Sequence, residues 1–169
     1  MRHLIFLLPV IISINSFGQA QDENFYLNDD KLTWQKAYAT DKTKEEVFNY
    51  FMESNILDKA KIEGNIVVAK LTPQFVDEKK VGIPGVPEII RDNDFIGDVI
   101  VDYKTKEKEY VITVSNLQFL GRGDHLKKNE KQDFEEQFVR IGYNKYRPGF
   151  LKRPKEVYNF TISPIFEMN

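Results

Sequence analysis

GDVIVDYKTKEKEYVITV, residues 97–114, is the stretch that decides the fold. Apolar residues alternate in its first part, at positions 99, 101 and 103, and again in its last part, at positions 110, 112 and 114. Alternation with a period of two is typical of a strand with one buried face. The charged turn between the two parts predicts that they pair as a β-hairpin. Val111, Leu117 and Phe119 add apolar residues, which predicts that the second strand is partly covered on both faces.

Upstream of the hairpin, the sequence predicts a strand, a helix and a second strand. Alternating apolar residues between positions 32 and 38 indicate the first strand. Thr43 and Glu46 have the spacing of a capping box, in which each side chain bonds the backbone amide of the other residue. Apolar residues follow at helical spacing, so we expect a helix over 44–56. The β-branched stretch 66–71 then predicts a short strand.

Downstream of the hairpin, the pattern predicts one more helix and one more strand. Asn129 can cap a helix, Phe134, Phe138 and Ile141 form an apolar stripe, and a glycine follows, so we expect a helix over 129–141. Residues 157–162 alternate and predict a final strand. Between the upstream and hairpin elements, residues 72–94 are rich in proline and glycine. A connection of that length is typical of a functional or mobile loop.

The first twenty residues have the pattern of a signal peptide. Arg2 gives a positive start, Leu4–Ile14 is almost continuously apolar, and Gly18 and Ala20 have the small side chains that signal peptidase accepts. The apolar run is shorter than the roughly 20 residues needed to span a bilayer. We therefore expect cleavage near Ala20, export to the periplasm or the cell exterior, and no transmembrane segment in the mature chain.

The amino-acid composition limits the class of protein to which the rest of the chain can belong. A content of 41% hydrophobic and 13% aromatic residues is typical of a globular protein and not of a disordered one. The absence of cysteine excludes disulfides, thiol catalysis and cysteine-ligated metals. We expect residues 1–20 to be the leader, 21–31 to be a flexible N-terminal arm, and 32–169 to form a single α+β domain.

The charge of the chain is unevenly distributed. The whole sequence carries 26 acidic and 24 basic side chains, but residues 120–155 carry ten basic and five acidic ones. Such a segment can present a basic face to an anionic partner. Alternatively, acidic and basic segments lie side by side in the fold and neutralise each other.

The order of strand, helix, strand and hairpin is carried by short stretches that together cover about residues 32–119. They are Leu32-Thr33-Trp34, Glu46-Val47-Phe48, Ile62-Glu63-Gly64-Asn65-Ile66-Val67, Gly97-Asp98-Val99-Ile100-Val101 and Tyr110-Val111-Ile112-Thr113-Val114-Ser115-Asn116. This order resembles a family of small exported bacterial domains of unknown function described as TBP-like. The resemblance implies a curved antiparallel sheet with helices on one face, and it implies no activity. We therefore expect an α+β fold with four to five strands and two helices packed on one face.

Few residues of the chain carry catalytic or metal-binding chemistry. His125 is the only histidine after the leader, and we interpret it as a solvated loop residue. Residues 92–98 begin like a calcium loop, but Ile96 and Tyr103 stand where oxygen ligands are required. Arg122-Gly123-Asp124 matches a tripeptide that integrin-type receptors bind, but we interpret it as an ordinary turn. We predict no catalytic residue, no metal and no cofactor.

Aromatic and basic residues interleave in the predicted loop 143–155. Rings can stack on a ligand while cations bind anionic groups. In the alternative interpretation the rings pack on the sheet and the cations stay solvated. The candidate ligand-binding residues are Tyr143, Lys145, Tyr146, Arg147, Phe150, Lys152 and Arg153. For an exported protein, the matching partners are anionic glycans, lipid headgroups or envelope proteins, and we expect no nucleic acid.

Two functions fit these observations. The first is a non-catalytic binding module of the bacterial cell envelope, which uses the loop 143–155 together with the apolar segment 81–90. The second is a hydrolase that acts on envelope polymers through carboxylates near 92–98, since paired carboxylates can cleave glycosidic bonds. A purely structural role in a larger assembly is also compatible with the sequence.

Overall fold

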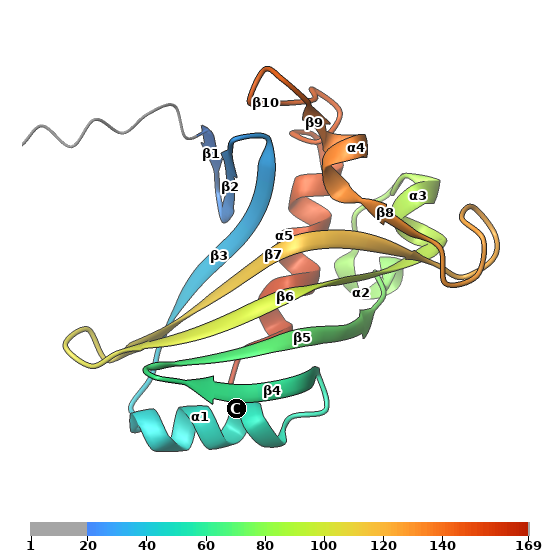
Figure 1. Cartoon of the computed structure of the whole chain (residues 1–169). Helices are drawn as coiled ribbons and strands as arrows, with labels where there is room; N and C mark the ends of the chain where they lie inside the picture. Colours follow the sequence, from blue (N-terminus) through green and yellow to red (C-terminus); the bar gives the residue numbers. More distant parts are fainter. Residues whose placement is uncertain (1–19, 169) are drawn as a thin grey trace, which may run out of the picture.

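The computed structural model describes residues 20–168 of the chain, so the expected leader lies outside the described residues except for Ala20. The fold is α+β, with one antiparallel sheet whose strand order is β1-β2-β3-β7-β6-β5-β4 (Figure 1). These strands are β1 (Ala20–Asp22), β2 (Phe25–Asn28), β3 (Lys31–Ala39), β4 (Leu57–Glu63), β5 (Ile66–Gln74), β6 (Asn93–Lys104) and β7 (Glu109–Gly121).

Three shorter strands complete the β-structure. β8 (Lys131–Asp133) pairs with the far end of β7, and β9 (Val139–Arg140) pairs with β10 (Lys145–Tyr146) as a separate ribbon. The helices of the described chain are α1 (Lys44–Glu53), α2 (Glu78–Val81), α3 (Glu88–Arg91), α4 (Phe134–Phe138) and α5 (Arg153–Ile165).

In Figure 1, α5 lies behind the sheet and α1 lies below β4 at the lower edge of the sheet, while no helix crosses the front of the central strands. Buried side chains of both helices join the buried side chains of the strands in one core. Phe51 of α1 and Phe166, the residue after α5, meet over the sheet with ring centroids 6.3 Å apart. Trp34 of β3 stacks on the same Phe166 ring at 6.2 Å. The core therefore lies between the covered face and these two helices.

The hairpin at the centre of the sheet is confirmed. β6 and β7 pair with Val99 opposite Val114 and Val101 opposite Ile112, and all four side chains are buried. The register shifts next to Gly97, where a β-carbon would lie 2.9 Å from Val114 Cγ1. Only glycine permits that approach, and such a bulge bends the strands.

The upstream elements are also confirmed, with longer or shorter bounds. β3 buries alternate residues as expected. Both bonds of the capping box form, since the Thr43 amide donates to Glu46 Oε2 at 2.7 Å and the Glu46 amide donates to Thr43 Oγ1 at 3.3 Å. The Thr43 amide and the Thr43 hydroxyl both donate to the Glu46 carboxylate, and these two bonds lower the pKa of Glu46. The helix ends at Glu53 and not at residue 56.

The number of strands was wrong, because the sheet has seven strands in its main order where four to five were expected. β4 carries mostly charged residues and only Leu57 is buried, so it has no alternating pattern to find. Part of the expected flexible arm 21–31 belongs to the sheet, because residues 25–28 form β2. β2 pairs with β3 and its Phe25 and Leu27 are fully buried.

The expected helix over 129–141 is replaced by β8, the five-residue α4 and β9. Asn129 has φ 65° and starts no helix, while Ile141 is 60% exposed. Phe134 and Phe138 are buried as expected, but they pack on Phe119 of β7 at 4.4 Å and 5.8 Å. These contacts with β7 favour a single helical turn between two short strands.

The expected strand over 157–162 is part of helix α5. Residues 72–94 are also more regular than expected, since they contain the end of β5, helices α2 and α3, and the start of β6. In the segment 81–90, Val86 and Ile90 belong to the core. No helix among residues 20–168 is both long enough and apolar enough to cross a membrane.

Candidate functional site

Three polar side chains of the sheet hold helix α5 in place. The Trp34 indole N–H donates to Asn159 Oδ1, the Tyr38 hydroxyl donates to the backbone carbonyl of Ser163, and the Tyr110 hydroxyl donates to that of Phe166, each at 2.8 Å. The three donors come from the covered face of β3 and β7. Their acceptors lie along α5 and its end, so the helix is fixed at a set distance from the sheet.

The two tyrosine anchors remain neutral donors over a wide pH range. Their rings stack with centroids 5.1 Å apart. Burial raises the pKa of Tyr38 well above its usual value, and burial raises the pKa of Tyr110 to about 12. A buried phenol resists ionisation because its charged form is poorly solvated.

A hollow of about 710 Å³ lies beside α5, and we call it the lysine hollow. Lys36 of β3 faces it because this residue shares the covered face of the sheet with Trp34 and Tyr38, which lie two positions away on either side. The remaining wall comes from the segment before β2 and from α5 with its flanks. The lining residues are Glu23, Asn24, Lys36, Lys152, Lys155, Glu156, Asn159, Phe160, Ser163, Pro164 and Glu167.

The less exposed part of the lysine hollow is cationic. Lys36 is half-buried, its ammonium lies 4.9 Å from the centre of the Tyr38 ring, and it forms no ion pair among residues 23–168. Lys155, with a side chain 15% exposed, lies 3.6 Å from Glu23. The carboxylate of Glu23 also accepts a hydrogen bond from the amide of Asn159 at 2.7 Å. Glu156 and Glu167 also line the hollow and are exposed, whereas Lys36 and Lys155 are partly buried.

A second hollow of about 480 Å³ lies along the neighbouring side of α5, and we call it the phenylalanine groove. It shares Phe160 and Pro164 with the lysine hollow. Phe75 and Phe160 are both 58% exposed. The lining residues are Gln74, Phe75, Asp77, Lys80, Val81, Phe160, Thr161, Pro164 and Ile165.

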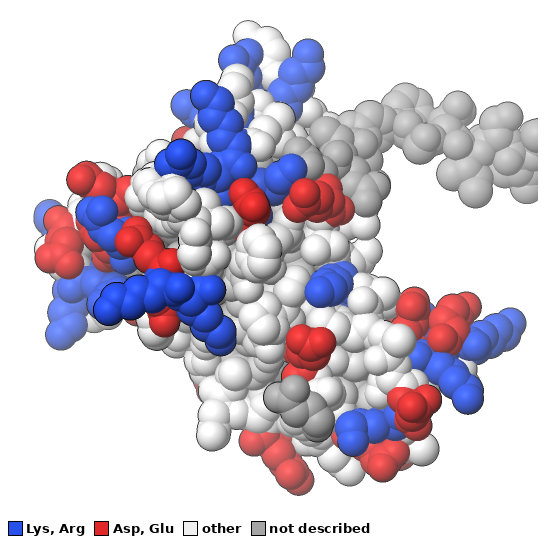
Figure 2. Space-filling view, turned by 180° about the vertical axis from the view of Figure 1, so that it is seen from behind, with Lys and Arg blue, Asp and Glu red and all other residues white. Residues whose placement is uncertain are grey.

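Figure 2 shows the side of the molecule that carries α5. Uncharged atoms cover the middle of this face, and Lys and Arg side chains gather toward the end that holds β9 and β10. The charged end and the uncharged middle meet along α5. The face therefore changes from cationic to largely uncharged along the helix.

The structure disperses the predicted ligand-binding residues. Phe150 is only 1% exposed and packs against Phe25 at 5.1 Å and Phe138 at 5.0 Å, so its ring belongs to the core. Tyr146 stacks on Phe150 at 5.3 Å. These two rings therefore pack against other aromatic side chains, in line with the alternative interpretation that the rings of this segment are packed and do not bind a ligand.

The predicted basic residues also have different surroundings. Arg147 donates from Nε to the carbonyl of Val139 at 3.0 Å, and Arg153 donates to the carbonyl of Gly85 at 3.2 Å. Both cations therefore hold backbone in place. Of the seven predicted residues, only Lys152 lines the lysine hollow.

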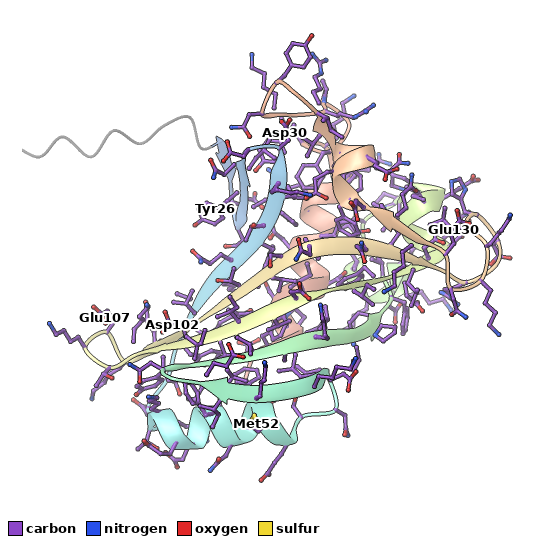
Figure 3. All side chains as sticks on the ribbon, viewed as in Figure 1. Tyr26, Asp30, Met52, Asp102, Glu107 and Glu130 are labelled. Carbon is purple, nitrogen blue, oxygen red and sulfur yellow. The ribbon has the colours of Figure 1, made fainter. Side chains whose placement is uncertain are left out.

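Tyr143 and Lys145 lie on the exposed turn around β10, and Asp30 fixes this turn. Asp30 Oδ1 accepts from the amide of Asn144 at 2.7 Å, Asp30 Oδ2 accepts from the amide of Gly142, and the Asp30 amide donates to Asn144 Oδ1 at 3.1 Å. Figure 3 shows Asp30 at the β2–β3 turn, beside the β9–β10 ribbon. Tyr143 is 74% exposed and lines neither hollow.

Sequence reasoning missed Lys36 and Asn159, although the sequence contains a signal for each. A lysine on the buried side of an apolar strand pattern must reach water through a gap in the covering layer, and Lys36 does so. Asn159 and Phe160 were assigned to a strand. A strand places Phe160 on the same face as Tyr158, whereas a helix turns residues two positions apart to nearly opposite sides. Tyr158 is accordingly buried while Phe160 is exposed.

The carboxylates near 92–98 do not converge. Asp92 pairs with Arg91, whose hydrogen bond lowers the pKa of this carboxyl. Asp94 lies 3.9 Å from Arg122, within the Arg122-Gly123-Asp124 turn. Asp98 is bonded by Lys70 and Asn116, and although partial burial opposes it, these bonds lower the pKa of Asp98. None of the three lines either hollow.

The remaining chemical candidates lie on the surface. His125 is exposed in its turn, as expected. Within residues 23–168, no three histidine, aspartate or glutamate side chains gather closely enough to hold a metal ion. The lysine hollow and the phenylalanine groove are therefore the features of this face that suit a ligand.

Two solved structures are similar to this chain. One is a TBP-like protein from Parabacteroides distasonis ATCC 8503, which is 12% identical with a TM-score of 0.47 over 83% of this chain and 93% of that chain. The other is a DUF4468 family protein from Bacteroides ovatus ATCC 8483, 11% identical with a TM-score of 0.47 over 84% of this chain and 90% of that chain. No family model and no curated protein matches the sequence. Function has to follow from the residues of the two hollows themselves.

Proposed function

We propose that this chain is a non-catalytic binding module of the bacterial cell envelope, and that the lysine hollow binds an anionic ligand, either a glycan or a lipid headgroup. The observation that carries this proposal is the convergence of Lys36, Lys152 and Lys155, from a strand and a helix, on one hollow. The volume of the hollow falls within the roughly 300–1,000 Å³ typical of small-molecule sites.

The position of Lys36 supports this proposal most directly. A half-buried ammonium without a carboxylate partner is costly to desolvate, and an anionic ligand supplies the missing charge. The Tyr38 ring beneath it offsets part of that cost in the free protein. Asn24 and Asn159 add amide groups that can hydrogen-bond hydroxyls or phosphate oxygens.

The surroundings of the other candidates disfavour the hydrolase hypothesis. The carboxylates of Asp92, Asp94 and Asp98 each lie against a different cation. The pKa of Asp92 and that of Asp98 are lowered, whereas a general acid needs a raised pKa. Retaining and inverting glycosidases both require two carboxyl groups that face each other across a cleft. Binding without catalysis is therefore the function that the geometry supports best.

Equilibrium binding tests the proposal with two soluble probes. The delipidated, phosphorylated polysaccharide of lipopolysaccharide represents a glycan, and glycerophosphoglycerol represents a lipid headgroup. Each lost charge-assisted hydrogen bond is worth about 1.5–3 kcal/mol, or roughly tenfold or more in Kd. We expect Lys152→Ser to weaken binding about tenfold and Lys36→Ser with Lys152→Ser to weaken it further.

The matched control is Lys106→Ser with Lys128→Ser, which removes two exposed lysines far from the hollow in sequence. This control is expected to bind like the wild type. Circular dichroism confirms that each variant is folded. The proposal fails if the wild type binds neither probe, or if the control pair loses as much affinity as the hollow pair.

A further inference from the structure

The lysine hollow and the phenylalanine groove are two parts of one surface feature. They share Phe160 and Pro164, so the Phe160 ring stands between a cationic compartment and an apolar one. Their volumes, about 710 Å³ and 480 Å³, both fall in the range of ligand sites. A ligand that extends past Phe160 therefore occupies both.

The phenylalanine groove has the composition of a site for hydrocarbon. Phe75, Val81 and Ile165 come from three different segments and contribute apolar side chains to its wall. Phe75 and Phe160 each leave more than half of their surface in water, although the core of this protein buries most of its phenylalanines. Fully burying such a side chain is worth about 1.5–3 kcal/mol, so a hydrocarbon chain laid in the groove gains affinity from both rings.

We propose, on the basis of the proposed function, that the ligand is a single anionic lipid molecule bound across Phe160. Its charged headgroup lies in the lysine hollow, and its acyl chain lies in the phenylalanine groove. The order of the two compartments matches the order of the two parts of such a molecule. A plain anionic glycan would leave the apolar groove empty.

The shape of the feature favours one lipid molecule and not a membrane surface. An interfacial helix inserts a protruding apolar face into the bilayer. Here the apolar face of α5 is buried against the sheet, with Val157, Tyr158 and Ile162 in the core. The exposed Phe75 and Phe160 instead line the phenylalanine groove, in which a single acyl chain can lie.

Three water-soluble probes, used below their micelle concentrations, separate the two compartments. Dodecyl phosphate has both parts of the proposed ligand, butyl phosphate has the charge with only a short chain, and dodecyl maltoside has the chain without the charge. Each buried methylene is worth about 0.8 kcal/mol. We therefore expect dodecyl phosphate to bind the full chain more than tenfold tighter than either other probe.

Variants of exposed residues assign the two parts. Phe75→Ser should weaken dodecyl phosphate binding about tenfold and leave butyl phosphate binding unchanged, whereas Lys152→Ser should weaken both. Tyr143→Ser, on an exposed ring outside both hollows, is the matched control and should change neither.

The possible failures are distinguishable. If butyl phosphate binds as tightly as dodecyl phosphate, or if Phe75→Ser has no effect, the lipid assignment is overturned while anion binding in the lysine hollow stands. If dodecyl maltoside binds as tightly as dodecyl phosphate, the headgroup assignment is overturned. If neither phosphate binds but the phosphorylated polysaccharide does, the lipid assignment is overturned while the proposed function stands; if the polysaccharide and glycerophosphoglycerol fail to bind as well, both are overturned. If the chain sediments as a dimer that Phe75→Ser dissociates, the groove is a self-association surface and the lipid assignment is overturned.

Discussion

Helices α1 and α5 cover the same face of the sheet, yet different forces determine them. α1 begins at a complete capping box, and its Val47, Phe48 and Phe51 form a buried stripe at helical spacing. α5 begins at Arg153, its N-cap residue Lys152 forms no side-chain cap, and it contains Pro164 near its end. Its position depends on hydrogen bonds from Trp34, Tyr38 and Tyr110 of the sheet.

This difference explains where the candidate site lies. The inner face of α5 packs on the sheet, so the residues on its outer face do not belong to the core. Lys152 and Phe160 are exposed on that outer face and line the hollows. α1 is specified by its own local sequence, and Tyr50 and Met52 are its exposed large hydrophobic residues. The following experiments test whether α5 depends on the sheet and α1 on its own cap.

The largest effect is expected from Phe166→Ala at the end of α5. Phe166 is fully buried and contacts both Trp34 and Phe51. Phenylalanine-to-alanine changes in a core cost about 3–5 kcal/mol of the free energy of unfolding. Urea unfolding followed by circular dichroism measures it. Phe160→Ala, on the exposed face of the same helix, should change this free energy by only about 0.5 kcal/mol. A loss below about 1 kcal/mol for Phe166→Ala would contradict the role of this ring in joining the two helices.

A smaller loss is expected from Asn159→Ala, which leaves the Trp34 indole N–H without its acceptor. An unsatisfied buried donor costs about 1–3 kcal/mol. Trp34 is the single tryptophan of the chain, so its fluorescence reports both the local change and unfolding in urea. Asn55→Ala, at an exposed position after α1, is the control. Equal stability of the two variants would show that the sheet does not need this anchor to hold α5.

The pH dependence of stability should reveal the tyrosine anchors. Folding raises the pKa of Tyr110 from 10.0 to about 12, so the folded state favours the protonated phenol. Its contribution is therefore fully present below pH 10 and is lost as the pH rises from 10 through about 12. Urea unfolding at pH 8, 10 and 11 should show a steeper decline for the wild type than for Tyr110→Phe. Tyr143→Phe, on an exposed ring, should decline like the wild type. If the free energy of unfolding fell equally with pH in the wild type and in Tyr110→Phe, ionisation of Tyr110 would not account for the loss of stability.

The smallest effect is expected from Thr43→Ala, which removes the cap of α1. Loss of a capping threonine at an exposed helix start costs about 0.5–1 kcal/mol. The change should lower the midpoint of urea unfolding slightly and leave ligand binding at α5 unaffected. Thr105→Ala in the exposed hairpin turn is the matched control. If ligand binding fell together with the cap, the two helices would not be independent.

Sequence patterns predicted the centre of the sheet well because the signals there are local. The β6–β7 alternation, the turn between these strands and the Thr43–Glu46 spacing each act within a few residues. β4 was missed because it is an edge strand of charged residues, which gives no period to detect. Phe25 and Leu27 were missed because only their pairing with β3 shows that the segment is a strand.

The candidate site was predicted only in part, and the reason lies in α5. Residues 157–162 alternate like a strand, yet Pro154, Tyr158, Ile162 and Phe166 recur every four positions and all are buried. Both periods are present in the sequence, and contact with the sheet selects the helical one. With this helix in place, Phe160 is exposed, and Lys152 and Lys155 line the same hollow as Lys36 of β3.

The sequence by itself determined the α+β class, the central hairpin and helix α1, because their stabilising bonds and apolar stripes connect near neighbours along the chain. Only the tertiary structure decided the seven-stranded sheet, the helical state of residues 153–165 and the two hollows beside them. The additional strands β2 and β4 depend on pairing with β3 and β5. The helix and the hollows depend on hydrogen bonds between residues more than fifty positions apart, such as Tyr110 with Phe166 and Trp34 with Asn159. A local pattern carries no information about which distant donor will meet which acceptor.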